Sequence, residues 1–173
     1  MTTEEHDDPD AAVAEQARRG DLVAFVEFAN RWWPAIYRFT WNMSGNNSFA
    51  AQATESTLVA ALRGSEPPSS RERFAIFLYR TALQFALTRD ATVRTAAKRA
   101  DAVATLRDAL QRLDPVDRAA VVLAEVAQLP MEQVSAVLST PPDETRKRVH
   151  RSLLALTDSM RSTLDSLNAL AAI

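Results

Sequence analysis

Cysteine is absent from this chain, and glycine and histidine are scarce: the 173 residues include three glycines and two histidines. Without cysteine, the protein can form neither disulfides nor thiolate metal sites. His6 and His150 lie far apart in the sequence, which leaves little to build a metal-binding cluster. The sequence therefore predicts that the protein holds no metal ion and no other cofactor.

Membrane-spanning and secretory signals are also missing. No apolar run approaches the roughly 18 residues that are needed to cross a bilayer. The first ten residues, MTTEEHDDPD, are acidic where a secretory signal is basic and then apolar. We expect residues 1–10 to form a disordered leader, and the protein to be cytoplasmic without membrane insertion.

Enzyme signatures do not appear either. The sequence has no glycine-rich phosphate loop. Ser152 lies close to His150 on the same predicted helix, but this neighbourhood does not orient a nucleophile against a base. We predict no catalytic residue and a protein that is not an enzyme.

Helix-forming residues fill the chain instead. Alanine, leucine, arginine and glutamate dominate its middle and end, and apolar residues recur at steps of three and four. Asp114 followed by Pro115 is a strong helix-start signal. An all-α fold follows. Its predicted helices span residues 11–19, 21–43, 49–63, 73–89, 106–113, 114–128 and 130–138, and a last helix begins near residue 143 and persists through residue 167.

Two small helical domains joined by a short linker are expected from this pattern. The helices within residues 11–90 can enclose one core, and those within residues 106–161 can enclose a second. Residues 91–105 carry few large apolar side chains, so we interpret them as the linker. Residues 162–173 then form a helical tail.

Basic residues gather near the start of the last helix, although the formal net charge of the chain is −2. At about 100° per residue, Lys147 and Arg151 point away from the side that carries Val149. A solvated helix face is the plain interpretation of such a run. The stretch PPDETRKRVHRS holds these basic side chains: Arg146, Lys147, Arg148, His150 and Arg151.

The residues before this run favour DNA binding. MEQVSAVL, residues 131–138, is a predicted short helix, STPP is a tight break, and the basic helix follows. A short helix, a short turn and a second helix with basic residues near its start form the helix-turn-helix pattern. The start of the second helix enters the major groove in that pattern, where arginine and lysine hold phosphates or reach guanine. We therefore predict contact with DNA.

The sequence LRDALQRLDPVDRAAVVLAEVAQLPMEQVSAVLSTPPDETRKRVHRSLLAL, residues 106–156, resembles the C-terminal domain of bacterial sigma factors of the extracytoplasmic-function group. GDLVAFVEFANRWWPAIYRFTWNMSGN and FAIFLYRTALQFAL similarly resemble parts of the N-terminal domain of that family. The resemblance implies a second domain of four helices, of the winged-helix-like sigma C-terminal type, that reads the −35 promoter element. It implies DNA contacts by Glu144, Thr145, Arg146, Lys147, Arg148, His150 and Arg151.

For the first domain, the resemblance implies binding to core RNA polymerase and to the −10 element. Sigma factors of this group are commonly held inactive by an anti-sigma protein, so such a partner is implied besides polymerase and promoter DNA. The residues at the matching positions for −10 recognition and melting are Phe77, Tyr79, Arg80 and Gln84, and those for polymerase binding are Gln52, Glu55 and Leu58.

One departure from the family pattern leaves an alternative open. The stretch NSFAAQATESTLVAAL holds a single acid, Glu55, where the family has a run of acids that grips polymerase. A helix that has lost its acids loses charge complementarity to a basic partner. We predict an extracytoplasmic-function sigma factor; the alternative is a sigma-like protein that does not bind polymerase and acts as an anti-sigma decoy or a DNA-binding repressor.

Overall fold

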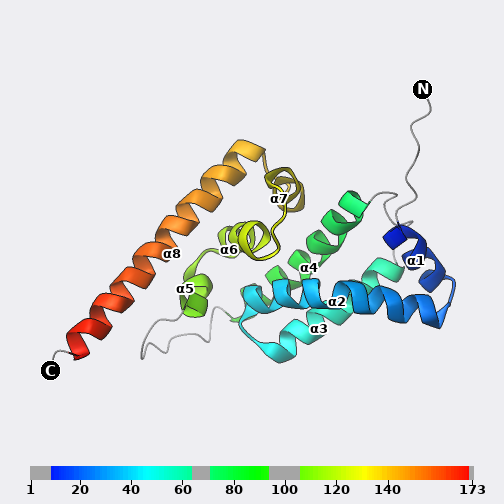
Figure 1. Ribbon diagram of the computed structural model, residues 1–173, viewed down its shortest axis with the longest axis horizontal. Helices are drawn as coiled ribbons and strands as arrows, with labels where there is room; N and C mark the ends of the chain where they lie inside the picture. The colour runs from blue at the N-terminus through cyan, green and yellow to red at the C-terminus, as the bar shows by residue number, and fades with distance from the viewer. Residues whose placement is uncertain (1–8, 64–70, 94–105, 172–173) are drawn as a thin grey trace.

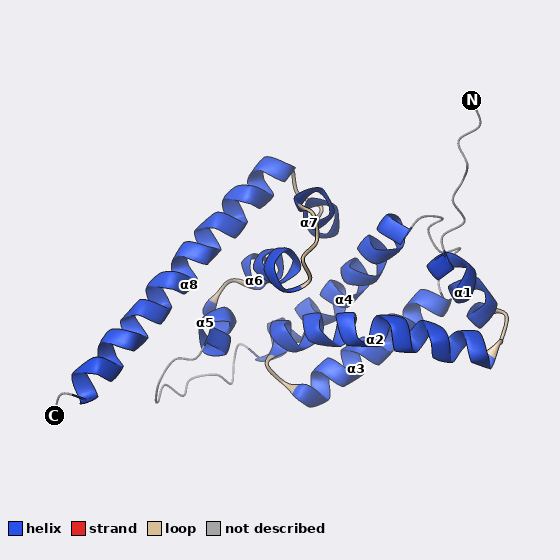
Figure 2. Cartoon of the chain, viewed as in Figure 1, coloured by secondary structure: helices blue, strands red, loops and turns tan. Residues whose placement is uncertain are grey.

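The computed structural model of the protein describes residues 9–63, 71–93 and 106–171, and within these ranges every regular element is a helix (Figure 1). The all-α prediction is confirmed, as Figure 2 shows. The elements are α1 (Pro9–Arg18), α2 (Leu22–Ser44), α3 (Asn47–Arg63), α4 (Arg71–Val93), α5 (Leu106–Arg112), α6 (Pro115–Val121), the π-helical segment η1 (Val122–Val126), α7 (Met131–Leu138) and α8 (Pro142–Ala171).

Capping residues set the ends of the long helix α2. The carboxylate of Asp21 accepts hydrogen bonds from the backbone N–H groups of Val23 and Ala24, at 2.9 and 3.2 Å. At the other end Gly45 takes the left-handed conformation, with φ of 62°, and its N–H donates to the carbonyl of Trp41. α2 therefore begins and ends within one residue of the predicted helix, residues 21–43.

The predicted helix 114–128 is formed by α6 and η1 together. Asp114 caps it by accepting from the N–H of Val116 at 3.0 Å, and Pro115 occupies the first helical position. The N–H of Ala127 donates to the carbonyl of Val122, five residues back, which gives the last turn its π-helical form. The chain then leaves the helix at Gln128, whose φ is 54°.

The four helices α1–α4, here called the N-terminal half, pack around buried aromatic side chains. Phe74 of α4 meets Phe28 edge-on, with ring centroids 5.9 Å apart, and lies 5.7 Å from Trp32. Helices α5–α8 and η1, the C-terminal half, lie beside this bundle (Figure 1). The buried apolar residues form one connected cluster through both halves, because α4 packs against α7, and α2 against α5 and η1.

Three of the four predicted domain boundaries, 10/11, 90/91 and 161/162, lie inside helices that the structure describes. The predicted linker begins inside α4, which extends to Val93, and its remainder, 94–105, is outside the described residues. The leader prediction is outside them up to residue 8, but residues 9 and 10 already belong to α1. α8 continues into the predicted tail as far as Ala171. No described helix combines the length and apolarity needed to cross a membrane.

Candidate nucleic-acid interface

A tight turn joins α7 to α8. Ser139 ends α7 in the left-handed conformation, with φ of 54° and ψ of 40°. The hydroxyl of Thr145 donates to the carbonyl of Pro141 at 3.0 Å and lies 2.7 Å from the hydroxyl of Thr140. These bonds fix the first turn of α8 against the break that precedes it. α8 then packs against α5, α6 and α7, as the helix-turn-helix prediction requires (Figure 1).

The first turns of α8 present basic side chains to solvent. Thr145, Val149 and Ser152 are buried on the inner side of the helix. Four basic side chains on the other sides are exposed, and we call them the cationic face: Arg146, Lys147, His150 and Arg151. None of the described residues forms an ion pair with Lys147, His150 or Arg151.

Arg146 forms exposed ion pairs. Its guanidinium lies 2.9 Å from the carboxylate of Asp143 and 3.5 Å from that of Glu132. All three side chains are more than half exposed, and pairs of this kind contribute little stability. A phosphate can therefore replace these carboxylates at small cost.

Arg148 has a different environment, although the sequence places it among its basic neighbours. Its guanidinium lies 2.5 Å from Asp117 of α6 and 3.2 Å from Glu144, and its side chain is only 19% exposed. Burial alone would lower the pKa of Arg148, but the hydrogen bonds and charges of the two carboxylates outweigh it and raise that pKa. Arg148 joins α8 to α6, so its guanidinium is not available to DNA in this arrangement, and its predicted DNA contact stays a prediction.

Thr145 also departs from its predicted role. Its side chain is fully buried, and its hydroxyl is used within the turn. It therefore cannot reach a groove that lies outside the helix. Glu144 is exposed at the start of α8, and part of its charge is directed to Arg148.

The residues predicted to contact the −10 element do not share one surface of α4. Gln84 is exposed and Phe77 is half-buried. Tyr79 is 5% exposed and meets Phe39 edge-on at 5.5 Å, so it lies in the core of the N-terminal half, and its contact with DNA stays a prediction. Burial raises the pKa of the Tyr79 hydroxyl, and the positive charge of Arg38 partly opposes this. Arg80 is exposed, but its guanidinium donates to the backbone carbonyl of Ala136 in α7.

The predicted polymerase-binding residues divide in the same way. Gln52 and Glu55 lie exposed on α3. Leu58 is 4% exposed and belongs to the core, so it is not on the exposed face of α3 with the other two, and its contact with polymerase stays a prediction. The helical period of α3 identifies its apolar side, and Leu58 lies on that side.

With this geometry established, we compared the chain with known proteins. A family model described as "Sigma-70, region 4" matches residues 104–156. These residues include α5, α6, α7 and the start of α8, and therefore the cationic face. This part of the chain is therefore similar to region 4 of sigma-70 proteins.

The fold extends the likeness beyond this region. The structure of CnrH in complex with the cytosolic domain of CnrY matches with a TM-score of 0.66 and 20% sequence identity, over 90% of this chain and 99% of CnrH. Comparison with the curated proteins found no match. The region 4 match supports a sigma-factor type of domain at residues 104–156, and the likeness to CnrH shows a shared fold; neither finding favours the decoy or repressor alternative.

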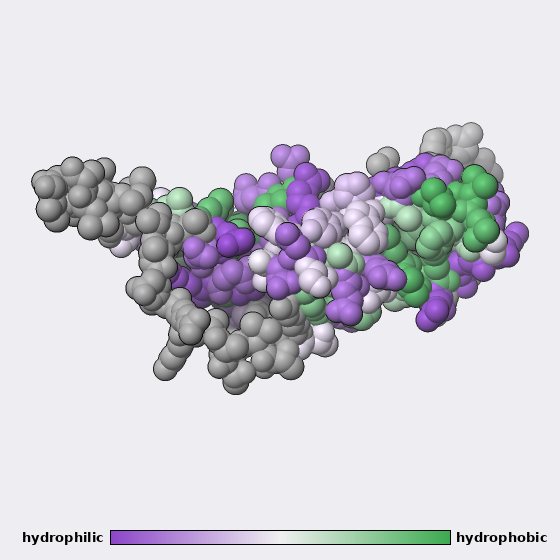
Figure 3. Space-filling view, turned by 90° about the horizontal axis from the view of Figure 1, so that it is seen from below, coloured by the Kyte–Doolittle hydropathy of each residue, from purple (hydrophilic) through white to green (hydrophobic). Residues whose placement is uncertain are grey.

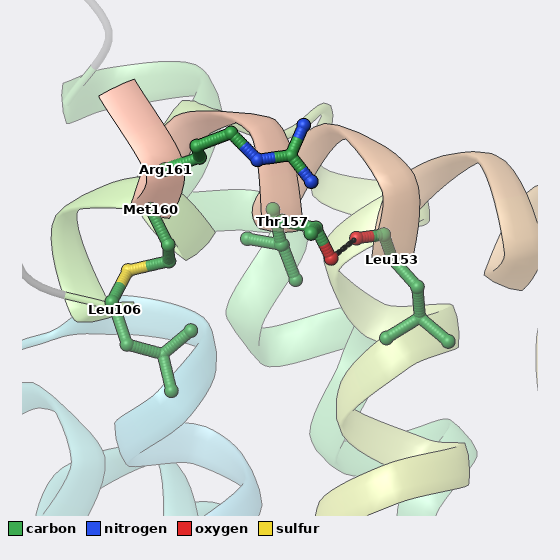
Figure 4. A pocket seen from close by; sticks show the side chains of 6 residues that line it. Leu106, Leu153, Thr157, Met160 and Arg161 are labelled. Carbon is green, nitrogen blue, oxygen red and sulfur yellow. Dashed lines mark hydrogen bonds between the residues drawn. The ribbon is translucent and has the colours of Figure 1, made fainter. Parts of the chain in front are cut away.

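The C-terminal half also carries an apolar groove that the sequence did not predict. The groove has a volume of about 450 Å³ and lies where the start of α5 faces α8 (Figure 4). Its only polar hydroxyl, on Thr157, donates to the carbonyl of Leu153 at 2.9 Å. The spacing of apolar residues along α8 could have indicated one wall of this groove. The other wall is Leu106 of α5, whose position opposite α8 the sequence does not show. The lining residues are Leu106, Leu153, Leu156, Thr157, Met160 and Arg161.

A second apolar surface lies at the opposite end of the molecule. Leu22 and Val23, at the start of α2, are 77% and 78% exposed, and Val26 is 54% exposed. Figure 3 shows hydrophobic side chains gathered at the end where α2 begins. The sequence predicts that these residues lie on a helix. Only the structure shows that they stay exposed, because no described helix packs over them.

Proposed function

We propose that this protein directs core RNA polymerase to a small set of promoters, and that the cationic face of α8 reads the −35 element. The observation that carries this proposal is the exposure of Lys147, His150 and Arg151 at the start of the second helix of a helix-turn-helix. This end of such a helix enters the major groove. The side chains that face the groove are therefore the ones that remain exposed.

The exposed residues differ in what they can recognise. Arg146, Lys147 and Arg151 can each hold a phosphate or donate to the acceptor edge of guanine. His150 can donate or accept at a base edge. Glu144 can accept from the amino group of cytosine, and it disfavours a nearby phosphate. The cationic face thus combines phosphate contacts, which position the helix, with side chains that distinguish bases.

Binding to core polymerase is proposed for the exposed face of α3 and for the groove between α5 and α8. Gln52 and Glu55 are exposed on α3 and can make polar contacts. The groove is lined mainly by apolar side chains and suits the apolar side of a partner helix. The groove residues Met160 and Arg161 lie ten residues along α8 from His150 and Arg151 of the cationic face, so protein and DNA can bind at separate positions.

A protein partner that regulates the chain is also proposed. CnrH, which shares the fold, was solved in complex with the cytosolic domain of CnrY. By analogy, we propose that an anti-sigma protein binds this chain and keeps it from polymerase. A protein that works on polymerase and chromosomal DNA acts in the cytoplasm, and we propose that location here.

Two binding measurements on the full chain test the proposal. The wild-type protein is expected to be retained by immobilised core polymerase and, in complex with it, to select specific duplexes from a pool of genomic fragments. Arg151→Ala should weaken binding to the selected duplex by about 1–3 kcal/mol if the lost contact is to a base edge. Absence of retention by core polymerase would contradict the proposal.

The matched control is Arg112→Ala. Arg112 is an exposed arginine in the last turn of α5, outside the cationic face, so its loss removes the same charge from the same domain. Equal weakening by Arg112→Ala and Arg151→Ala would mean that net charge, and not the cationic face, governs binding.

A further inference from the structure

Helix α2 carries most of the large apolar side chains that this protein exposes. Of the seven such side chains that are exposed among the described residues, five lie on α2. Figure 3 shows hydrophobic side chains gathered at the end where this helix begins. Single apolar residues are common on protein surfaces, but a concentration of them on one helix marks an interaction site.

Six uncharged residues follow the outer side of α2 at steps of three and four, so they share one face of the helix. The opposite face is buried in the core through Phe28, Trp32 and Ile36. The first three of the six residues are small or medium in size, and the last three are aromatic. All six are exposed or half-buried, and we call them the α2 stripe: Val23, Val26, Asn30, Trp33, Tyr37 and Trp41.

The spacing of the α2 stripe is that of a seam between two paired helices. Its two halves are also complementary in size when two copies of α2 lie antiparallel. With the twofold axis between Asn30 and Trp33, Asn30 faces Trp33 of the second copy. Val26 then faces Tyr37 of the second copy, and the ends of the stripe follow the same relation. Each layer combines a smaller side chain with an aromatic ring, which fills the contact without a clash or a gap.

The polar groups at the centre of the α2 stripe match in the same arrangement. The indole N–H of Trp33 can only donate, and the side-chain carbonyl of Asn30 can accept. An indole N–H that becomes buried needs such a partner, and the twofold axis provides the pair twice. The charged residue beside the centre, Glu27, lies 2.7 Å from Arg31 of its own copy, so its charge is compensated before two copies meet.

The exposed area of this surface is sufficient for a specific contact. At about 150–200 Å² for a whole large side chain, about 400 Å² per copy comes from the exposed parts of Leu22, Val23, Val26 and Trp33. The other residues of the α2 stripe add to this area, so a symmetric pair buries about 1,000 Å² in total, at the lower end of specific interfaces. We therefore expect reversible association, with a Kd on the order of 10–100 μM.

We propose that two copies of the chain associate through the α2 stripe as an antiparallel pair. A surface that is complementary to itself fits a second copy of the same chain. This association goes beyond the proposed function, because it requires neither DNA nor polymerase.

Sedimentation equilibrium of the full chain tests the association. The average mass should rise from one chain towards two as the concentration rises from about 1 to 500 μM, a range that brackets the expected Kd. Val26→Glu should weaken the association by about tenfold or more, because the new carboxylate would be buried against Tyr37 without a partner. A mass of one chain at every concentration would overturn the proposal, and would mean that the stripe binds a different protein.

The matched control for Val26→Glu is Leu154→Glu. Leu154 is 52% exposed on α8, outside the α2 stripe, so its substitution introduces the same charge at an apolar surface position. It should leave the association unchanged. Equal weakening by both variants would overturn the role of the stripe, provided that far-UV circular dichroism shows the same helix content in each.

The absence of cysteine allows the orientation of the pair to be tested by disulfide crosslinking. In the antiparallel pair, Val26 and Tyr37 of different copies face each other, within the range of about 4.4–6.8 Å between Cα atoms that a disulfide requires. Under mild oxidation, a mixture of Val26→Cys and Tyr37→Cys chains should therefore crosslink faster than either variant alone. A mixture of Leu154→Cys and Tyr37→Cys serves as the control and should crosslink slowly. Faster crosslinking of each variant with itself would overturn the antiparallel arrangement.

Discussion

Neighbouring arginines of one short stretch have different roles in this protein. Arg151 is exposed on the cationic face, whereas Arg148, three residues earlier, is held between Asp117 and Glu144. The helical period shows that Arg148 and Arg151 point to different sides of α8. Only the position of α6 in the structure shows that the carboxylate of Asp117 lies beside Arg148. The charge run in the sequence therefore overstates the number of cations that DNA can meet.

This difference predicts opposite effects of two substitutions. Arg148→Ala should lower the free energy of unfolding by about 1–3 kcal/mol, because it leaves Asp117 without its charged partner at a half-buried position. Arg151→Ala should leave that free energy unchanged and weaken DNA binding. Urea unfolding of both variants, followed by circular dichroism, measures the difference. Equal stability of the two variants would show that the pair with Asp117 contributes nothing.

At the scale of the elements, the turn between α7 and α8 contains a residue in an unfavourable conformation. Ser139 has φ of 54°, a left-handed conformation that glycine adopts without steric cost. Ser139 is exposed, so its side chain can be removed without loss of packing.

Ser139→Gly is therefore expected to raise the free energy of unfolding by about 1 kcal/mol, because the left-handed conformation costs a non-glycine residue about 1–2 kcal/mol and the greater chain entropy of glycine offsets part of this gain. Ser139→Val should lower it, because a β-branched residue is strained at positive φ. Thermal unfolding of the three proteins provides the comparison. A Ser139→Gly variant less stable than the wild type would indicate that the serine side chain stabilises the turn in a way that outweighs its backbone strain.

The sequence predicts where the helices begin and end more accurately than it predicts which side chains are buried between them. Caps such as Asp21 and Asp114 act locally, so the predicted starts of α2 and α6 agree with the structure. Tyr79, Leu58 and Thr145 were assigned to outer surfaces by alignment with a family pattern, yet all three are buried. For Leu58 and Thr145 the helical period already indicates the buried side, and the family pattern disagrees with it. The burial of Tyr79 depends on its contact with Phe39 of α2, which the sequence of α4 does not reveal.

At the scale of the whole molecule, the two halves share one connected core and two arginine caps, in which Arg118 of α6 donates to the carbonyl of Met43 and Arg80 of α4 donates to that of Ala136. The acceptors of these caps are the backbone carbonyls of Met43 and Ala136, and backbone carbonyls have no signature in a sequence. Arg80 and Arg118 could be identified as basic residues, but not as caps of distant helices. The arrangement of the halves is thus the part of the structure that sequence reasoning could least anticipate.

The central claim is that this chain gives core polymerase its promoter specificity. Transcription by purified core polymerase on a pool of genomic fragments, with and without the full chain, tests that claim most directly. The account predicts new transcripts from a small set of start sites when the wild-type chain is added, and fewer of them with Arg151→Ala but not with Arg112→Ala. An unchanged transcript pattern on adding the wild-type chain would contradict it.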